Sequence, residues 1–179
     1  MSRIGRAPIA IPAGVNLTVD GTTIKVTGPK GTLSCTVDKV IDFKVENNEI
    51  VFTRNSENKE VRAKHGLYRA LVANMVKGVT TGFVKSVIIN GVGYKAQVNG
   101  NKLILNIGYS HPCEVIAPEG ITFECPTATE ILVKGFDKEL VGQTAANLKA
   151  LRPVEPYHAY GVRYKTDVVV MKEGKKAGK

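Results

Sequence analysis

Hydrophobic and polar residues alternate along several short stretches of the chain, a pattern that predicts β-strands. Two such stretches, residues 20–26 and 99–105, match each other at an offset of about 79 residues and begin with Asp-Gly and Asn-Gly. These dipeptides favour a tight hairpin in which both central residues take positive φ. A second pair of matching strands lies at residues 49–53 and 130–134. The pattern therefore predicts a repeated group of antiparallel strands.

A helical pattern follows the last strand of each repeat. Between residues 61 and 77, Leu67, Leu71 and Met75 recur every four residues and predict a buried stripe that ends at Gly78. The second helix is expected over residues 138–151, with Pro153 after its end. Its apolar positions are Leu140 or Val141, Thr144, Leu148 and Leu151.

The predicted fold class is α+β, with two tandem copies of a small module made of an antiparallel sheet and one helix. The first module is expected to span residues 1–81 and the second residues 82–179. Cys35 in the first copy matches Cys113 in the second, as if both were equivalent strand positions. That correspondence favours a structural role for both thiols.

Charge is concentrated near the C-terminus. The chain has 179 residues and a net charge of +9. Residues 149–179 contain 8 Lys or Arg and 3 Asp or Glu, whereas residues 81–148 contain 5 and 6. An excess of cations in one part of the chain predicts a polyanionic partner for that part.

Three of the six tyrosines lie in residues 152–165, among Arg152, Arg163 and Lys165 and a single acid, Glu155. Aromatic rings stack on unpaired bases and interleaved cations bind phosphates, so this pattern predicts contact with RNA. The alternative is a loop at the edge of a sheet whose tyrosines cover a small core.

The other motifs favour structural roles. Gly91-Val92-Gly93 lacks the third glycine of a dinucleotide-binding loop and precedes a strand pattern, which predicts a bend or bulge. Gly28-Pro29-Lys30-Gly31 predicts a tight turn. Ser110 and His111 are adjacent and would point to opposite faces, so they do not predict a nucleophile and its base. His65 is expected to be solvated or to cap a helix.

No cofactor or metal is predicted, because the spacing of the cysteines and histidines does not match a zinc site. Three cysteines suit a reducing compartment. Residues 1–6 lack the apolar core of a signal peptide, and the apolar run Val168–Met171 is too short to span a bilayer. These features predict a cytoplasmic protein. The basic tail could meet an anionic membrane, but no amphipathic helix accompanies it.

Several motifs, in order along the chain, resemble a known family. They are Ser2-Arg3-Ile4-Gly5, Gly28-Pro29-Lys30-Gly31, Gly91-Val92-Gly93-Tyr94, residues 105–112 (LNIGYSHP), residues 153–157 (PVEPY) and Gly161-Val162-Arg163-Tyr164. The chain is similar over its whole length to bacterial ribosomal protein six of the large subunit.

The resemblance implies a non-enzymatic component of the large ribosomal subunit with two α+β domains. It also implies that the C-terminal domain binds large-subunit ribosomal RNA near the base of the factor-binding stalk, beside other ribosomal proteins. In the family, the Glu-Pro-Tyr element is usually followed by Lys-Gly-Lys-Gly, and here it is followed by His158-Ala159-Tyr160-Gly161. We hypothesise that Tyr160 replaces a phosphate contact with stacking.

The expected RNA contacts therefore lie in the last 31 residues. They are Lys149, Arg152, Tyr157, His158, Tyr160, Arg163, Tyr164, Lys165, Lys172, Lys175, Lys176 and Lys179. Two other function classes are a free-standing RNA-binding module, which would not sediment with ribosomes, and a small enzyme. The sequence shows no catalytic constellation or small-molecule site that would favour an enzyme.

Overall fold

The computed structural model describes residues 3–46 and 48–175. The chain divides into two compact units. The first ends at Gly82 and also includes Phe136–Lys138, and the second is the rest of the chain. Separate folding of the two expected modules, residues 1–81 and 82–179, stays a prediction.

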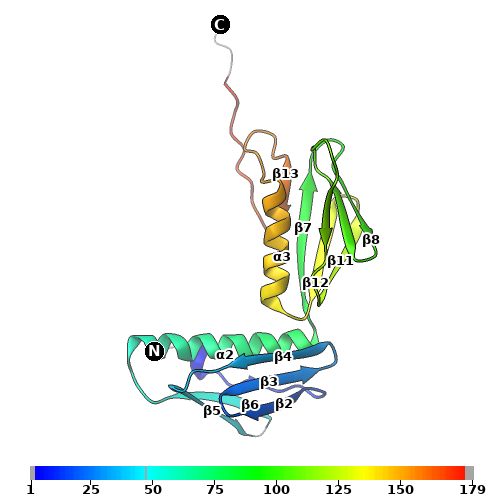
Figure 1. Cartoon of the computed structure of the whole chain (residues 1–179). Coiled ribbons are helices and arrows are strands. Elements are labelled where there is room, and N and C mark those ends of the chain that lie inside the picture. The colour runs from blue at the N-terminus through cyan, green and yellow to red at the C-terminus, as the bar shows by residue number, and fades with distance from the viewer. Residues whose placement is uncertain (1–2, 47, 176–179) are drawn as a thin grey trace. The chain divides into compact units, whose positions relative to one another are not determined.

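The first unit combines two three-stranded antiparallel sheets with a long helix (Figure 1). Its elements are α1 (Arg3–Arg6), β1 (Ile9–Ala10), β2 (Asn16–Asp20), β3 (Thr23–Gly28), β4 (Gly31–Thr36), β5 (Ile41–Glu46), β6 (Glu49–Arg54) and α2 (Lys59–Thr80). The strand orders are β2-β3-β4 and β1-β6-β5. Alternate residues of β3 and β6 are buried against α2, as period-two strands require.

The second unit repeats this plan and adds a strand. Its elements are β7 (Phe83–Asn90), β8 (Lys95–Asn99), β9 (Lys102–Asn106), β10 (Cys113–Ile116), β11 (Ile121–Thr127), β12 (Glu130–Gly135), α3 (Lys138–Leu151) and β13 (Gly161–Tyr164). The strand orders are β8-β9-β10 and β11-β12-β7-β13. The described part of the first unit has no counterpart of β13. The predicted α+β fold with a repeated module is confirmed.

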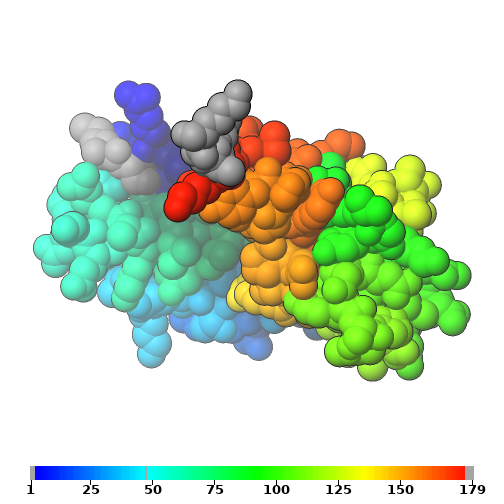
Figure 2. Space-filling model, turned by 90° about the horizontal axis from the view of Figure 1, so that it is seen from above, coloured from blue at the N-terminus to red at the C-terminus, as the bar shows by residue number. Residues whose placement is uncertain are grey.

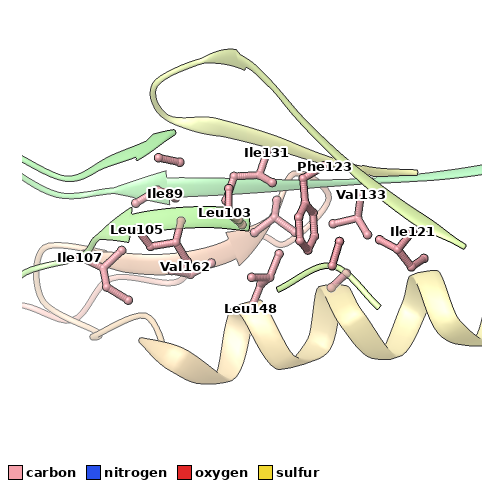
Figure 3. Packing of buried hydrophobic residues seen from close by; sticks show 14 of the residues in the cluster. Ile89, Leu103, Leu105, Ile107, Ile121, Phe123, Ile131, Val133, Leu148 and Val162 are labelled. Atoms are coloured by element: carbon pink, nitrogen blue, oxygen red, sulfur yellow. The ribbon is translucent and has the colours of Figure 1, made fainter. Parts of the chain in front are cut away.

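One apolar core fills the second unit (Figure 3). Leu148 projects from α3 toward the strands, and Val162 brings β13 into the same cluster. Leu103, Leu105, Ile131 and Leu148 are fully buried. The predicted second helix, residues 138–151, is confirmed at both ends. Val141, Thr144 and Leu148 face the core as expected, and Leu140 and Leu151 are partly buried beside it.

The buried face of α2 differs from the predicted stripe. Leu67 is 52% exposed and Leu71 is 37% exposed, and only Met75 of the three is buried. The buried residues of α2 are His65, Val72, Met75, Val76, Gly78 and Val79. Residues four apart advance about 40° around a helix of 3.6 residues per turn, so the row from Leu67 reaches the buried face only at Met75.

His65 is buried, so the prediction of a solvated or capping histidine is wrong. Its Nε2 lies 3.0 Å from the carbonyl oxygen of Phe52, and its Nδ1 lies 3.4 Å from Nη1 of Arg54. Since the carbonyl only accepts, Nε2 carries the proton and Nδ1 accepts from Arg54. Both ring nitrogens of His65 therefore have hydrogen-bond partners. The ring is buried on the same face of α2 as Val72.

The end of α2 is also later than predicted. Gly78 lies inside the helix, which continues to Thr80. Gly82 takes φ +78°, and the amides of Thr81 and Gly82 both donate to the carbonyl of Lys77. A glycine with positive φ just beyond the last turn is a common way to end a helix.

Both predicted hairpins form, with a different turn. Asp20 pairs with Thr23 and Asn99 with Lys102, so each glycine is the first of two central residues. Gly21 (φ +56°) and Gly100 (φ +59°) have positive φ, whereas the residues after them do not. This is the pattern of a type II′ turn, in which only the first central residue requires positive φ.

The two cysteines are not equivalent positions. Cys35 pairs with Ile24, whereas Cys113 pairs with Leu105, which corresponds to Val26 of the first unit. The sequence match is therefore wrong by two residues. Because the shift is even, both thiols still lie on the same face of their strands and are half-buried, which agrees with a structural role.

Candidate nucleic-acid interface

The predicted RNA-binding stretch begins as a closed loop between α3 and β13. The amide of Val162 donates to the carbonyl of Arg152 at 2.8 Å, and the amide of Glu155 donates to the carbonyl of Tyr160 at 3.0 Å. Gly161, at φ +139°, lies against the backbone of residues 152–154. A Cβ at this position would approach the carbonyl oxygen of Pro153 to 2.7 Å. Only glycine fits this crossing without displacement.

The loop presents three aromatic side chains to solvent. Tyr157 is 52% exposed and Tyr160 is 38% exposed. The rings of His158 and Tyr160 stack, with centroids 5.4 Å apart and planes inclined by 21°. Between them, Ala159 takes the left-handed φ of +59°, and its carbonyl accepts from Nδ2 of Asn90 at 2.9 Å.

The only carboxylate in the loop is turned onto the loop's own backbone. Glu155 accepts from the amide of Tyr157 at 3.2 Å and from that of His158 at 2.5 Å. Its Oε1 also lies 3.3 Å from Nδ1 of His158. Partial burial raises the pKa of Glu155, but the nearby backbone N–H groups outweigh it and the net pKa lies below its ordinary value. The loop is thus stabilised by an ionised carboxylate.

Tyr164 lies among three charged groups. The ammonium nitrogens of Lys85 and Lys149 lie 4.4 Å and 4.7 Å from the centre of its ring. Lys149 also pairs with Asp167 at 2.6 Å, and the amide of Tyr164 donates to the same carboxylate at 3.2 Å. The hydrogen bond from Lys149 is the main cause of the lowered pKa of Asp167. The alternative in which tyrosines cover a core describes Tyr164, which packs against the buried cluster, better than Tyr157.

Both predicted arginines make intramolecular contacts. The guanidinium of Arg152 lies 5.0 Å from the centre of the Tyr109 ring. Nη1 of Arg163 donates to the carbonyl of Asp167 at 2.9 Å, while its buried Nε has no hydrogen-bond partner within the described chain. Arg163 also lines an open hollow of about 590 Å³ between the end of α3, the loop and the tail.

The described tail folds back beside the loop, and in the space-filling view its red residues lie next to the orange segment that follows α3 (Figure 2). The amide of Lys172 donates to the carbonyl of Pro156 at 2.8 Å. Lys172 and Lys175 are exposed, and Lys165 pairs with Glu130 at 3.1 Å. The predicted contacts Lys176 and Lys179 lie outside the described residues.

Sequence reasoning missed Lys85, Asn90 and Tyr109, which contact Tyr164, the Ala159 carbonyl and Arg152 respectively. Lys85 and Asn90 both belong to β7, which pairs with β13. Their contacts follow from the pairing of the short edge strand at residues 161–164 with β7. The described part of the first repeat has no matching strand, so the repeat pattern could not reveal them.

The arrangement suits binding rather than catalysis. It offers exposed rings, a group of cations and backbone-held turns, which together match unpaired RNA bases and phosphates. Within residues 3–46 and 48–175, no three His, Cys, Asp or Glu side chains are placed to hold a metal. In the same ranges, no helix is long and apolar enough to cross a membrane.

Comparison with known proteins agrees with the repeated fold. A family model described as ribosomal protein L6 matches residues 11–82 and 90–165. The chain belongs to this family. The resemblance predicted from the motifs is therefore confirmed, and one matched segment falls in each repeat.

Curated relatives cover the chain almost completely. A protein named large ribosomal subunit protein uL6 from Syntrophomonas wolfei is 51% identical over 179 residues, which is 100% of both chains. Proteins of the same name from Enterococcus faecalis and Shouchella clausii are 51% and 52% identical over 175 residues, 98% of each chain. The predicted non-enzymatic, structural role in the ribosome is confirmed by membership of this family.

Proposed function

We propose that this protein is a structural component of the large ribosomal subunit that binds large-subunit ribosomal RNA mainly through its second unit. The observation that carries the proposal is the gathering of exposed rings and cations around the loop at residues 152–160, β13 and the tail. The hydrogen bond from the amide of Lys172 to the carbonyl of Pro156 supports it, because it holds the backbone of the basic tail against the loop that carries the rings.

Within this surface, different residues have different roles. Tyr157 and the stacked pair His158–Tyr160 meet unpaired bases, and Lys172 and Lys175 meet phosphates without reading sequence. The remaining proposed contacts are Lys149, Arg152, Arg163, Tyr164, Lys165, Lys176 and Lys179. Tyr164 acts mainly by placing Lys85 and Lys149 at the surface, since its own ring is packed against the core.

The proposed site of action is the cytoplasmic ribosome, near the base of the factor-binding stalk and beside the ribosomal proteins there. The surface would hold the RNA in shape where translation factors dock. Hydroxyl-radical footprinting of the large-subunit RNA, with and without the protein, tests this placement. Protection confined to RNA remote from the factor-binding region would contradict it.

Sedimentation of the tagged protein from lysate, at moderate and at high salt, tests the assignment as a whole. We expect stoichiometric retention in the large subunit through the high-salt wash. A protein that stays at the top of the gradient but binds short RNAs tightly would instead be a free-standing RNA-binding module.

Matched charge variants test which unit binds. Lys172→Ala with Lys175→Ala removes two exposed cations from the tail, and Lys25→Ala with Lys44→Ala removes two from β3 and β5 of the first unit. We expect the tail variant to reduce the slope of log affinity against log salt by about one to two units, and the control to leave it unchanged. Equal effects of the two variants would count against a site in the second unit.

A further inference from the structure

We infer that the stacked rings of His158 and Tyr160 form a platform for one unpaired RNA base, with the base on the outer face of the imidazole. This inference deepens the proposed function and rests on it. It assigns the two rings one joint role, in which Tyr160 positions His158.

The platform is formed before any ligand binds. A residue in the left-handed region turns the chain sharply, and Ala159 does so at φ +59° although it is not glycine. This turn lets the rings of His158 and Tyr160, two residues apart, form an offset stack with their centroids 5.4 Å apart. The loop is fixed on both sides, since Asn90 holds the carbonyl of Ala159 and Glu155 holds the amide of His158. A preorganised stack loses little conformational entropy when a base is added.

The exposures indicate which ring meets the base. The side chain of His158 is 70% exposed, and Tyr160 as a whole residue is 38% exposed, so both rings are open to solvent. One face of the imidazole stacks with the phenol ring, and we assign the base to its other face. Every base has a π-face, so such a platform takes a base by stacking and is tolerant of sequence.

The surroundings favour a nucleotide over a protein side chain. The backbone amide of Lys172 donates to the carbonyl of Pro156, so this exposed lysine belongs to a segment that lies against the loop carrying the rings, and its cation is available to a phosphate there. The carboxylate of Glu155 is occupied by two backbone amides and does not face that phosphate as a free charge. A base, with its phosphate, uses both the rings and the cation.

Binding of the full chain to deproteinised large-subunit ribosomal RNA, measured over a range of salt concentrations, tests the inference. His158→Ala and Tyr160→Ala are each expected to weaken binding by about 5- to 150-fold with no change in the salt slope. His158→Phe and Tyr160→Phe keep the rings and are expected to bind within about twofold of the wild type. Because the two rings act together, the double alanine variant should lose far less than the product of the two single losses.

The outcomes separate the inference from the function on which it rests. If the wild type does not bind this RNA, and the Lys172→Ala Lys175→Ala variant behaves identically, the proposed function fails. If the wild type binds and His158→Ala binds equally well, the platform is wrong and the proposed function stands. If the alanine variants bind the RNA normally but are lost from the large subunit, the rings contact a protein and the inference is overturned. Circular dichroism and the phenylalanine variants identify any loss that comes from misfolding.

Discussion

Ala159 and Gly161 together give the chain its sharp course between the exposed rings and β13. Both have φ values in the region that favours glycine, +59° and +139°, but only one of them is glycine. The two positions also differ in surroundings, because Gly161 touches the backbone of residues 152–154. We therefore expect Ala159→Gly to stabilise the second unit and Gly161→Ala to destabilise it.

Ala159→Gly is expected to stabilise the second unit by about 1 kcal/mol, because the left-handed conformation strains alanine and does not strain glycine. Urea denaturation followed by tyrosine fluorescence measures the change. The matched control is Ala70→Gly inside α2, which should destabilise by about 0.5–1 kcal/mol. A loss of stability in Ala159→Gly would show that the turn is not strained.

Gly161→Ala is expected to destabilise by about 1–3 kcal/mol, because the new Cβ would lie 2.7 Å from the carbonyl oxygen of Pro153 at a φ that alanine avoids. The shift of the thermal midpoint measures it. Gly174→Ala, where a Cβ would meet nothing within 4 Å, serves as control and should leave the midpoint unchanged. Similar midpoints for the two variants would contradict the close crossing.

The last part of the chain is joined to two elements through Asp167. Its carboxylate pairs with Lys149 of α3 and accepts from the amide of Tyr164 in β13. The pKa of Asp167 lies below its ordinary value, chiefly because of the hydrogen bond from Lys149. A lowered pKa in the folded state adds stability above the ordinary pKa, and this stability is lost as the pH falls through the folded-state value.

Asp167→Asn is therefore expected to lower the thermal midpoint at pH 7, and the difference from the wild type should shrink as the pH falls below about 4. Thermal melts of both proteins between about pH 2 and pH 7 measure this difference in midpoint. Asp42→Asn, at an exposed position of β5, is the control. A difference that is constant across this range would mean that the charge of Asp167 plays no part.

The corrected face of α2 makes a second prediction about elements. Val72→Ala is expected to cost about 2 kcal/mol, because Val72 is fully buried and the substitution leaves a cavity. Leu67→Ala removes more carbon from an exposed position and should change stability by less than about 0.5 kcal/mol. Denaturant midpoints compare the two. A larger loss of stability for Leu67→Ala than for Val72→Ala would instead support the buried stripe that the sequence predicts.

The contrast between the two helices explains how far the sequence could predict this fold. In α3, the apolar residues follow the 3.6-residue period and the prediction is correct at both ends. In α2, the regular four-residue spacing of Leu67 and Leu71 conceals a true face that contains His65, a residue that polarity alone assigns to solvent. Its burial depends on Phe52 and Arg54, which only the folded sheet brings close.

For the candidate interface, local composition predicts the segment but not how its side chains are placed in the fold. Tyr157, His158 and Tyr160 are exposed as a contact surface requires. In contrast, Lys149 and Arg163 are engaged with Asp167, and Lys85 is contributed by a strand about 80 residues earlier. Such contacts depend on how β13 aligns with β7. The repeat pattern does not predict this alignment, because none of the described strands of the first unit corresponds to β13.

Within residues 3–46 and 48–175, each unit has an apolar core of its own. Leu148→Ala is expected to cost the second unit about 2–5 kcal/mol, because Leu148 is fully buried. Amide hydrogen exchange should become faster in β7, β12 and α3 and stay unchanged in β3, β6 and α2. Faster exchange in both sets would contradict two separately folding modules.

The ion pairs Lys149–Asp167 and Lys165–Glu130 have a consequence for selectivity. Each lysine already has an internal counterion, so a phosphate that reaches it competes with a carboxylate instead of occupying a vacant charge. At these positions, the binding free energy that a phosphate gains is therefore only the difference between its own pairing with the lysine and the pairing of the carboxylate that it displaces. On the proposed RNA-binding role, a flexible polyanion such as heparin would gain little from this exchange, whereas an RNA of fitting shape would add contacts to the rings at the same time. The two carboxylates would then favour binding of that RNA over binding of polyanions in general.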